Sequence, residues 1–227
     1  MSAQLSPSSF FLVTVDGRQI LVNPDNTDCR ATQLVPRYDL LKDPKEPLAV
    51  DIEFQEYKSV DAESWSHRIG RIAIVDTSKD TIYDTYVHYD YDETIEVKMP
   101  PPEFGVTWDD IDPKNLAQPI SEVSDALNRI MADRTIIGHG MGLDIASLKP
   151  ALHCKVDFVD TQAMYGKRKL STCAQEELKT TIQEDELHFP TEDALATMEL
   201  YLLVHPYEGW KDIDPAALAS KKGLPQA

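Results

Sequence analysis

The sequence lacks long hydrophobic runs and has few cysteines, and both shortages exclude classes of protein. No apolar stretch approaches the roughly 20 residues that a membrane-spanning helix needs, so we expect no membrane span. The apolar run at residues 10–13 is too short for the core of a signal peptide, and no basic residue precedes it. The three cysteines (Cys29, Cys154 and Cys173) are an odd number in no metal-binding spacing, which favours a reducing intracellular compartment, either cytoplasmic or nuclear. We expect Cys154 and Cys173 to be small core residues.

Basic residues are also scarce. Only 22 lysines and arginines stand against 39 aspartates and glutamates, which gives a net charge of −17. Proteins that bind nucleic acid without sequence preference usually have a basic surface, so this balance argues against a generic polyanion binder. Either some of the acids hold cations and the rest discourage tight binding, or the acidity only keeps the protein soluble. For the bulk of the charge we favour solubility.

The N-terminal part is distinct from the rest of the chain. Two β-rich runs within residues 10–22 flank Asp16-Gly17, a dipeptide that accepts the positive φ angles of a tight hairpin turn. The next stretch, residues 23–47, is rich in Pro, Asp and Asn and predicts an irregular wrap onto the main domain. The hairpin is a candidate surface for a protein partner or for self-association. We therefore divide the chain into an N-terminal extension (residues 1–46), a main domain (47–206) and a C-terminal tail (207–227).

The main domain has the pattern of an α/β protein with a mixed sheet flanked by helices. Apolar runs predict strands at residues 48–54, 68–76, 81–87, 134–138 and 156–159. Polar or proline-marked loops are expected at residues 55–67 and 89–113. Apolar positions three and four residues apart predict helices at residues 120–131, 143–152 and 171–182. A last helix follows Thr191, a plausible N-cap, with Glu192 and Asp193 in its first turn.

Two acids lie together on the first strand of the main domain. Asp51 and Glu53 are two residues apart, so their side chains point to the same face of a sheet. Carboxylates beside an apolar run are costly to bury unless a cation or a donor compensates them. A third acid, Asp144, follows a glycine-rich segment at residues 138–142 that permits a sharp turn into a helix. A helix-capping role is the alternative for Asp144.

His188 and Asp193 lie five residues apart at the start of the last helix. Taken alone, Asp193 is also a favourable first-turn acid and His188 also an ordinary loop residue. The joint order of four carboxylates and one histidine is more informative. It suits a site that holds two divalent cations and activates water.

This order resembles the DEDDh family of 3′-to-5′ exonucleases, which have a ribonuclease H-like fold. The sequence is most similar to the branch of the interferon-stimulated 20 kDa exonuclease and its ribosomal-RNA-processing relatives. Three features depart from the family pattern: the loop after Glu53, the short segment at residues 171–187, and everything before Pro47. Beyond the acids, the resemblance lies in residues 70–75, 83–87, 105–107, 137–140, 159–161 and 192–201.

The resemblance implies a metal-dependent 3′-to-5′ exonuclease that acts on single-stranded RNA or DNA 3′ ends and releases nucleoside 5′-monophosphates. RNA is the favoured substrate; a DNA-preferring enzyme and a catalytically silent nucleic-acid-binding or interaction module are the alternatives. The implied cofactors are two Mg²⁺ or Mn²⁺ ions, and His188 is the implied general base, with an ordinary pKa near 6.5. The implied metal ligands are Asp51, which bridges, with Glu53, Asp193 and Asp144.

Substrate contacts are predicted around the 3′-terminal nucleotide. Trp108 is, like Phe54, a candidate for stacking on a base. For Phe54 and Met141 core packing is an equal alternative. Residues 167–169 form the one local basic cluster, for which a solvated loop is slightly favoured over phosphate binding. The candidate contacts are Ile52, Phe54, Thr107, His139 and Met141.

Overall fold

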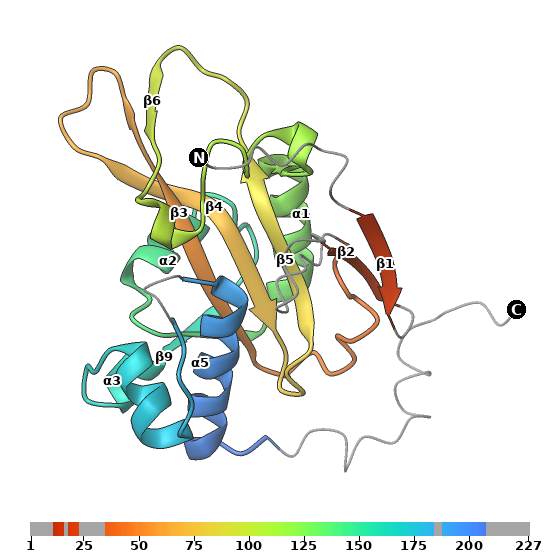
Figure 1. The fold of residues 1–227 in the computed structure, drawn as a ribbon. Helices are drawn as coiled ribbons and strands as arrows, with labels where there is room; N and C mark the ends of the chain where they lie inside the picture. The colour runs from red at the N-terminus through yellow and green to blue at the C-terminus, as the bar shows by residue number, and fades with distance from the viewer. Residues whose placement is uncertain (1–10, 16–17, 23–34, 184–187, 208–227) are drawn as a thin grey trace, which may run out of the picture.

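A computed structural model describes residues 11–15, 18–22, 35–183 and 188–207 (Figure 1). Its centre is a seven-stranded sheet in which six strands follow the order β7-β5-β4-β3-β8-β9, and β6 pairs with the outer part of β3. None of the helices in these ranges combines the length and the apolar character needed to cross a membrane. The strands are β3 (Leu48–Ser59), β4 (Ser66–Val75), β5 (Thr81–His88), β6 (Ile95–Lys98), β7 (Gln118–Pro119), β8 (Thr135–Gly138) and β9 (Asp157–Asp160).

The sheet is mixed, as the sequence pattern predicts. Strands β3, β4 and β5 form an antiparallel meander, whereas β8 and β9 join the β3 edge in parallel. Two predicted loops are wrong in part. The polar stretch at residues 55–67 continues β3 as far as Ser59 and opens β4 at Ser66, and the stretch at 89–113 contains β6. These strand segments have polar side chains and were read as loops. They extend beyond the main core, where a strand does not need alternating apolar residues.

The helices agree less closely with the prediction. Helix α1 has the predicted bounds, but α2 ends four residues early. The predicted helix at residues 171–182 is correct only in part: a short helix passes into a π-helical turn, Ala174–Leu178, and the helical segment ends at Lys179, which has a positive φ. The helices are α1 (Ile120–Met131), α2 (Gly142–Leu148), α3 (Thr161–Met164), α4 (Leu170–Cys173) and α5 (Pro190–Val204), with short 3₁₀ turns at Pro102–Phe104 and Pro113–Asn115.

Helices α1 and α5 cover opposite faces of the sheet (Figure 1). Along β3, Leu48, Val50 and Ile52 join the core cluster that contains α1, whereas Ala49 packs with residues of α5. Side chains alternate across a strand, so Asp51 and Glu53 point to the α5 face. Burial of one apolar set therefore fixes which face receives the acids.

The N-terminal segment contains the predicted hairpin. β1 (Phe11–Val15) and β2 (Arg18–Val22) pair antiparallel, with Phe11 opposite Val22. The turn dipeptide Asp16-Gly17, Cys29, and most of the predicted wrap and of the C-terminal tail lie outside the described residues. The three-part division of the chain and a partner role for the hairpin stay predictions. The other two cysteines are free thiols; Cys173 is buried, and Cys154 is partly buried against the main core.

A buried ion pair joins β4 to β5 beneath the α5 face. Arg71 donates to both carboxylate oxygens of Asp84, with Nε–Oδ1 and Nη2–Oδ2 distances of 2.9 and 2.8 Å. Asp84 is fully buried and also accepts a hydrogen bond of 2.8 Å from the Thr191 hydroxyl at the start of α5. The pair therefore connects the centre of the sheet with the helix that covers it.

Replacing Arg71 by methionine should destabilise the protein strongly, because Asp84 would keep a buried charge without its partner. We expect Arg71→Met to lower the free energy of unfolding by about 3–5 kcal/mol in urea titrations followed by circular dichroism. Lys114→Met, at an exposed position, serves as the control and should change it by less than about 0.5 kcal/mol. A loss of under about 1 kcal/mol for Arg71→Met would contradict a structural role for the pair.

Candidate active site

The first two carboxylates stand on the central strand. Asp51 and Glu53 lie opposite Ala73 and Arg71 of β4, and the strand register shifts directly after Glu53. Such bulges re-aim side chains and are common beside active sites. Glu53 is only 4% exposed although no hydrogen bond of its carboxylate is found among the described residues. A buried charge of this kind requires compensation from a cation.

Asp144 lies in the first turn of α2 and is 8% exposed. The turn before it is held by Asp160, whose carboxylate accepts hydrogen bonds from the backbone N–H groups of Gly140 (2.8 Å) and Met141 (3.3 Å). Gly140 has a φ of 75°, a conformation that favours glycine. The glycine-rich segment therefore sets the position of Asp144.

His188 and Asp193 come from the loop before α5 and from its first turn. The prediction of Thr191 as N-cap is wrong: α5 begins at Pro190, Phe189 occupies the cap position, and the Thr191 hydroxyl bonds to Asp84 instead. Thr191 lies inside the first turn, one residue after the helix start, and its hydroxyl donates its proton to the buried Asp84 carboxylate, a strong acceptor. Thr191 thereby attaches the first turn of α5 to the sheet two residues before Asp193.

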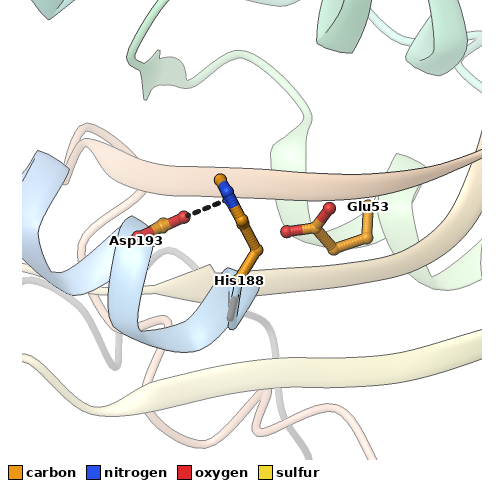
Figure 2. A group of neighbouring side chains, drawn as sticks. All are labelled: Glu53, His188 and Asp193. Carbon is orange, nitrogen blue, oxygen red and sulfur yellow. Dashed lines mark ion pairs between the residues drawn. The ribbon is translucent and has the colours of Figure 1, made fainter. Parts of the chain in front are cut away.

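Glu53, His188 and Asp193 form a compact group (Figure 2). One nitrogen or oxygen atom from each lies within 4.8 Å of the corresponding atoms of the others. His188 Nδ1 is 3.6 Å from Asp193 Oδ2, and Asp193 is 3% exposed. Asp51 and Asp144 are not in this tight group, but all five predicted residues line one cavity of about 750 Å³.

Two residues of the site were missed by the sequence analysis. Gln183 donates a hydrogen bond of 2.8 Å to Asp193 Oδ2, and its Nε2 lies 3.4 Å from His188 Nδ1. The Phe104 ring packs against the His188 imidazole with 4.9 Å between centroids. The backbone N–H of His188 also donates a hydrogen bond of 2.8 Å to the backbone carbonyl of Glu103. Neither residue carries a pattern in the sequence, because each reaches the site from an irregular segment.

The carboxylates raise one another's pKa values. Burial raises the pKa of Asp51 well above its usual range, and the negative charges of Asp193, Asp144 and Glu53 raise it further. Burial also raises the pKa of Glu53 to about 8 and that of Asp144 to about 7. The pKa of His188 is raised from its ordinary value, contrary to the prediction, because the Asp193 carboxylate lies 3.6 Å from Nδ1 and favours the protonated ring. The protein alone therefore leaves this cluster short of positive charge.

The residues fit a divalent cation. Oδ1 of Asp193 is buried without a hydrogen-bond partner among the described residues, while Oδ2 receives the amide of Gln183. Four carboxylates offer the hard oxygen donors that Mg²⁺ and Mn²⁺ prefer. A bound cation would give the orphaned oxygen a partner and offset the repulsion among the acids.

The predicted substrate contacts divide into two groups. Ile52, Phe54 and His139 line the 750 Å³ cavity with the acids. Both ring nitrogens of His139 are engaged, with Thr161 Oγ1 and the Arg168 carbonyl, each at 2.9 Å. Thr107 and Met141 do not line the cavity.

Both misplaced contacts have a physical explanation. The Thr107 hydroxyl bonds to Asp110 in an exposed loop, at 2.6 Å. Met141 is fully buried, and its side chain occupies the space where a Cβ on Gly138 would lie, so the core-packing alternative is correct. Trp108 is exposed on a different cavity, where it cannot stack on a base held beside the acids.

The predicted basic cluster is largely neutralised. Arg168 forms ion pairs with Glu176 and Glu177 of the π-helical turn. Lys169 lines the 750 Å³ cavity, and Lys167 occupies a left-handed turn position. The arrangement favours the solvated-loop interpretation for Arg168 and leaves Lys169 at the cavity, which Lys98, paired with Glu56, also lines.

Comparison with known proteins supports the fold. No protein-family model matches the chain, and the search of curated proteins finds no significant match. Among solved structures, the Neurospora crassa Pan2 catalytic unit, with protease and nuclease domains, matches at 22% identity and a TM-score of 0.57, over 81% of this chain and 30% of that one. The Saccharomyces cerevisiae Pan2 pseudoubiquitin hydrolase–RNA exonuclease module in complex with A7 RNA matches at 23% identity and a TM-score of 0.58, over 82% and 33%.

These matches confirm the predicted ribonuclease H-like α/β fold. The chain spans about a third of the length of the solved chains that it matches. At this identity the likeness concerns the fold alone. Membership of the branch of the interferon-stimulated 20 kDa exonuclease stays a prediction.

Replacing Glu53 by glutamine should change the free energy of unfolding by an amount that depends on pH and on bound metal. The pKa of Glu53 in the folded protein, about 8, exceeds its unfolded value near 4.3, so stability is lost as the pH rises through the folded value. In EDTA, Glu53→Gln should therefore be more stable than the natural protein by a margin that widens from pH 5 to pH 8. Added Mn²⁺ should raise the melting temperature of the natural protein and narrow or reverse that margin. A margin that is independent of both pH and Mn²⁺ would contradict the cation site.

Proposed function

We propose that this protein is a metal-dependent 3′-to-5′ exonuclease that hydrolyses single-stranded nucleic acid and releases nucleoside 5′-monophosphates. One observation carries the proposal: five residues from three distant segments, Asp51, Glu53, Asp144, His188 and Asp193, line a single cavity. Three buried carboxylates (Glu53, Asp144 and Asp193) beside the partly buried Asp51 are costly to maintain without a function that uses their charge. The Pan2 matches add support, since the nuclease region they contain belongs to proteins described as RNA exonucleases.

The four carboxylates, Asp51, Glu53, Asp144 and Asp193, would hold two Mg²⁺ or Mn²⁺ ions. Bound there, such ions supply positive charge that stabilises the transition state of phosphodiester hydrolysis and lower the pKa of the attacking water. The chain's own residues fix the ligands: Asp160 sets the turn before Asp144, and Thr191 anchors the turn that carries Asp193. Gln183 leaves one oxygen of Asp193 free by occupying the other.

His188 would act as the general base. Its Nδ1 faces Asp193, so the imidazole is oriented with Nε2 as the nitrogen that accepts a proton from water. Contact with Phe104 and the backbone hydrogen bond to Glu103 restrict the ring. The raised pKa of His188 strengthens it as a proton acceptor.

The substrate end would lie beside the acids. Phe54 and the backbone around Ile52 and Glu53 line the cavity where a 3′-terminal nucleotide would sit. His139 forms part of the cavity wall, and the two hydrogen bonds of its ring fix the orientation of the imidazole. We favour RNA as the substrate, because the Saccharomyces cerevisiae Pan2 matches include complexes with RNA.

Two substitutions separate proton transfer from cation binding. His188→Ala should lower kcat on a 5′-labelled RNA oligonucleotide by about 10²- to 10⁴-fold and leave the Mn²⁺-dependent rise in melting temperature intact. Asp193→Asn should lower both, because a metal ligand is lost. Gel analysis of products and thermal denaturation measure the two effects. If His188→Ala removes the Mn²⁺ response, the histidine is a ligand; if the natural protein shows the Mn²⁺ response but no shortening, the chain is a silent binding module.

Matched oligonucleotides test the preference for RNA. We expect kcat/KM with Mn²⁺ to be at least about tenfold higher for an RNA hexanucleotide than for the DNA hexanucleotide of the same sequence, a difference of about 1.4 kcal/mol. A protein tells RNA from DNA through the 2′-hydroxyl, so an RNA carrying a single 3′-terminal deoxynucleotide locates the contact. A higher kcat/KM on DNA would make the protein a DNA-preferring exonuclease.

A further inference from the structure

A second cavity lies next to the catalytic one. It has a volume of about 390 Å³ and shares His67 with the catalytic cavity. Glu56 of β3 lines the catalytic cavity and its neighbour Tyr57 lines the second. Successive side chains of a strand point to opposite faces, so the two cavities lie on either side of β3 and meet at His67.

Helix α2 also links the two cavities. Leu143 and Asp144 line the catalytic cavity, and Ser147 lines the second. Asp144 and Ser147 are three positions apart on the helix, which is about 4.5 Å along the axis. A chain molecule bound beside Asp144 can therefore reach the second cavity within one helical turn.

Arg68 forms a wall of the second cavity. Its Nε donates a hydrogen bond of 3.0 Å to Gln55, which is fully buried and donates in turn to the Val87 carbonyl. The guanidinium packs over the Tyr89 ring at 3.9 Å from its centroid, with the Tyr57 ring at 5.6 Å. These contacts hold the planar group in one orientation and leave its two Nη groups without a hydrogen-bond acceptor in residues 35–183 and 188–207.

Arg68 has no acidic ion-pair partner among the described residues, a property it shares with Arg129 and Arg134. Arg71 and Arg168, by contrast, both pair with carboxylates. Burial lowers the pKa of Arg68 from its usual value. The guanidinium has thus lost water without gaining a protein anion, which is the condition of a site that binds an anion from outside.

The remaining walls suit a nucleotide. Ser147 is 3% exposed, and its hydroxyl has no hydrogen-bond partner among the described residues. Apolar contact comes from Ile95, Ile120 and Pro150. A few polar groups in a mainly apolar wall are typical of sites for small organic groups.

We propose that the second cavity is a subsite for the substrate strand on the 5′ side of the nucleotide being released, where Arg68 binds a backbone phosphate and the apolar wall contacts its sugar and base. This inference rests on the proposed function, because it takes the strand from the catalytic cavity. It gives an acidic protein a local cation for a polyanionic substrate. Guanidinium forks match phosphate oxygens, and base and sugar contacts need no sequence preference.

The test measures binding without hydrolysis. The probe is a 5′-fluorescein-labelled RNA hexanucleotide with phosphorothioate linkages, titrated in Mn²⁺ and followed by fluorescence anisotropy. Arg68→Met should raise Kd by about 10- to 100-fold, the range for loss of a charge-assisted hydrogen bond. The slope of log Kd against log salt should fall by about 0.7, the value for one phosphate contact on a single strand. Arg68→Lys, which keeps the charge but loses the fork, should recover part of the affinity.

Arg129→Met is the matched control. Arg129 is exposed on α1 and packs over the Tyr38 ring at 3.8 Å, so it presents the same kind of contact away from both cavities. Its substitution removes one positive charge and one cation–π contact and should change Kd by less than about twofold, with an unchanged salt slope. The Mn²⁺-dependent rise in melting temperature of each variant verifies that the fold is retained.

The outcomes separate this proposal from the exonuclease activity. Equal Kd values for Arg68→Met and Arg129→Met, or no binding of the hexanucleotide by the natural protein, would overturn the subsite. So would a nucleoside 5′-monophosphate that competes as tightly as the hexanucleotide, since the cavity would then hold free product. An Arg68-dependent Kd in a protein that hydrolyses no RNA would support the subsite while the proposed activity fails. If the protein hydrolyses RNA but Arg68→Met leaves Kd unchanged, the exonuclease activity is supported and the subsite is overturned.

Discussion

The mutual repulsion of four carboxylates around one cavity is the constraint on which the rest of the structure depends. Asp51, Glu53, Asp144 and Asp193 come from three elements, and burial raises the pKa of three of them. Flexible attachments would let such groups move apart into water. Each acid instead stands on a regular element: the middle of β3, or the first turn of α2 or α5. The sheet and its helices thus hold carboxylates so close together that they stay ionised together only when cations compensate their charge.

The buried pair of Arg71 and Asp84 is the counterpart of this repulsion. Arg71 is the nearby cation that lowers the pKa of Glu53, although burial outweighs it. Asp84 anchors α5 through Thr191, so the same network that places positive charge beside Glu53 also sets the turn that carries Asp193. A fully paired network of this kind rigidifies a core, whereas a single unpaired member would be costly. Support of the site and stability of the sheet therefore depend on the same contacts.

Much of this arrangement was readable from the sequence, and the failures have identifiable causes. Apolar patterns located α1 and five of the seven sheet strands, because burial dictates those residues, whereas β6 and β7 were not predicted. The outer part of β3 was missed, since strands beyond the core need no apolar alternation. Thr191 was misassigned as the N-cap because its hydroxyl donates to Asp84, an acceptor on the distant strand β5 that the local sequence does not reveal. The sequence could not predict that Gln183 lies in the site or that Thr107 lies outside it. Both residues are in irregular segments, where no periodic pattern fixes the direction of a side chain.

The net charge of −17 limits how this protein could bind a polyanion. Nonspecific attraction along a basic surface is unavailable to this protein, so affinity for a polyanion must come from a few desolvated contacts and from cations held by the acids. Arg68 is half-buried and oriented by Gln55, and among the described residues it pairs with no acid, whereas Arg168 is neutralised by Glu176 and Glu177. In a low-dielectric cavity one such cation contributes more than several solvated lysines. An acidic surface around it would then repel strands that do not enter the cavities, so the same charge that weakens general binding favours a strand threaded by its end.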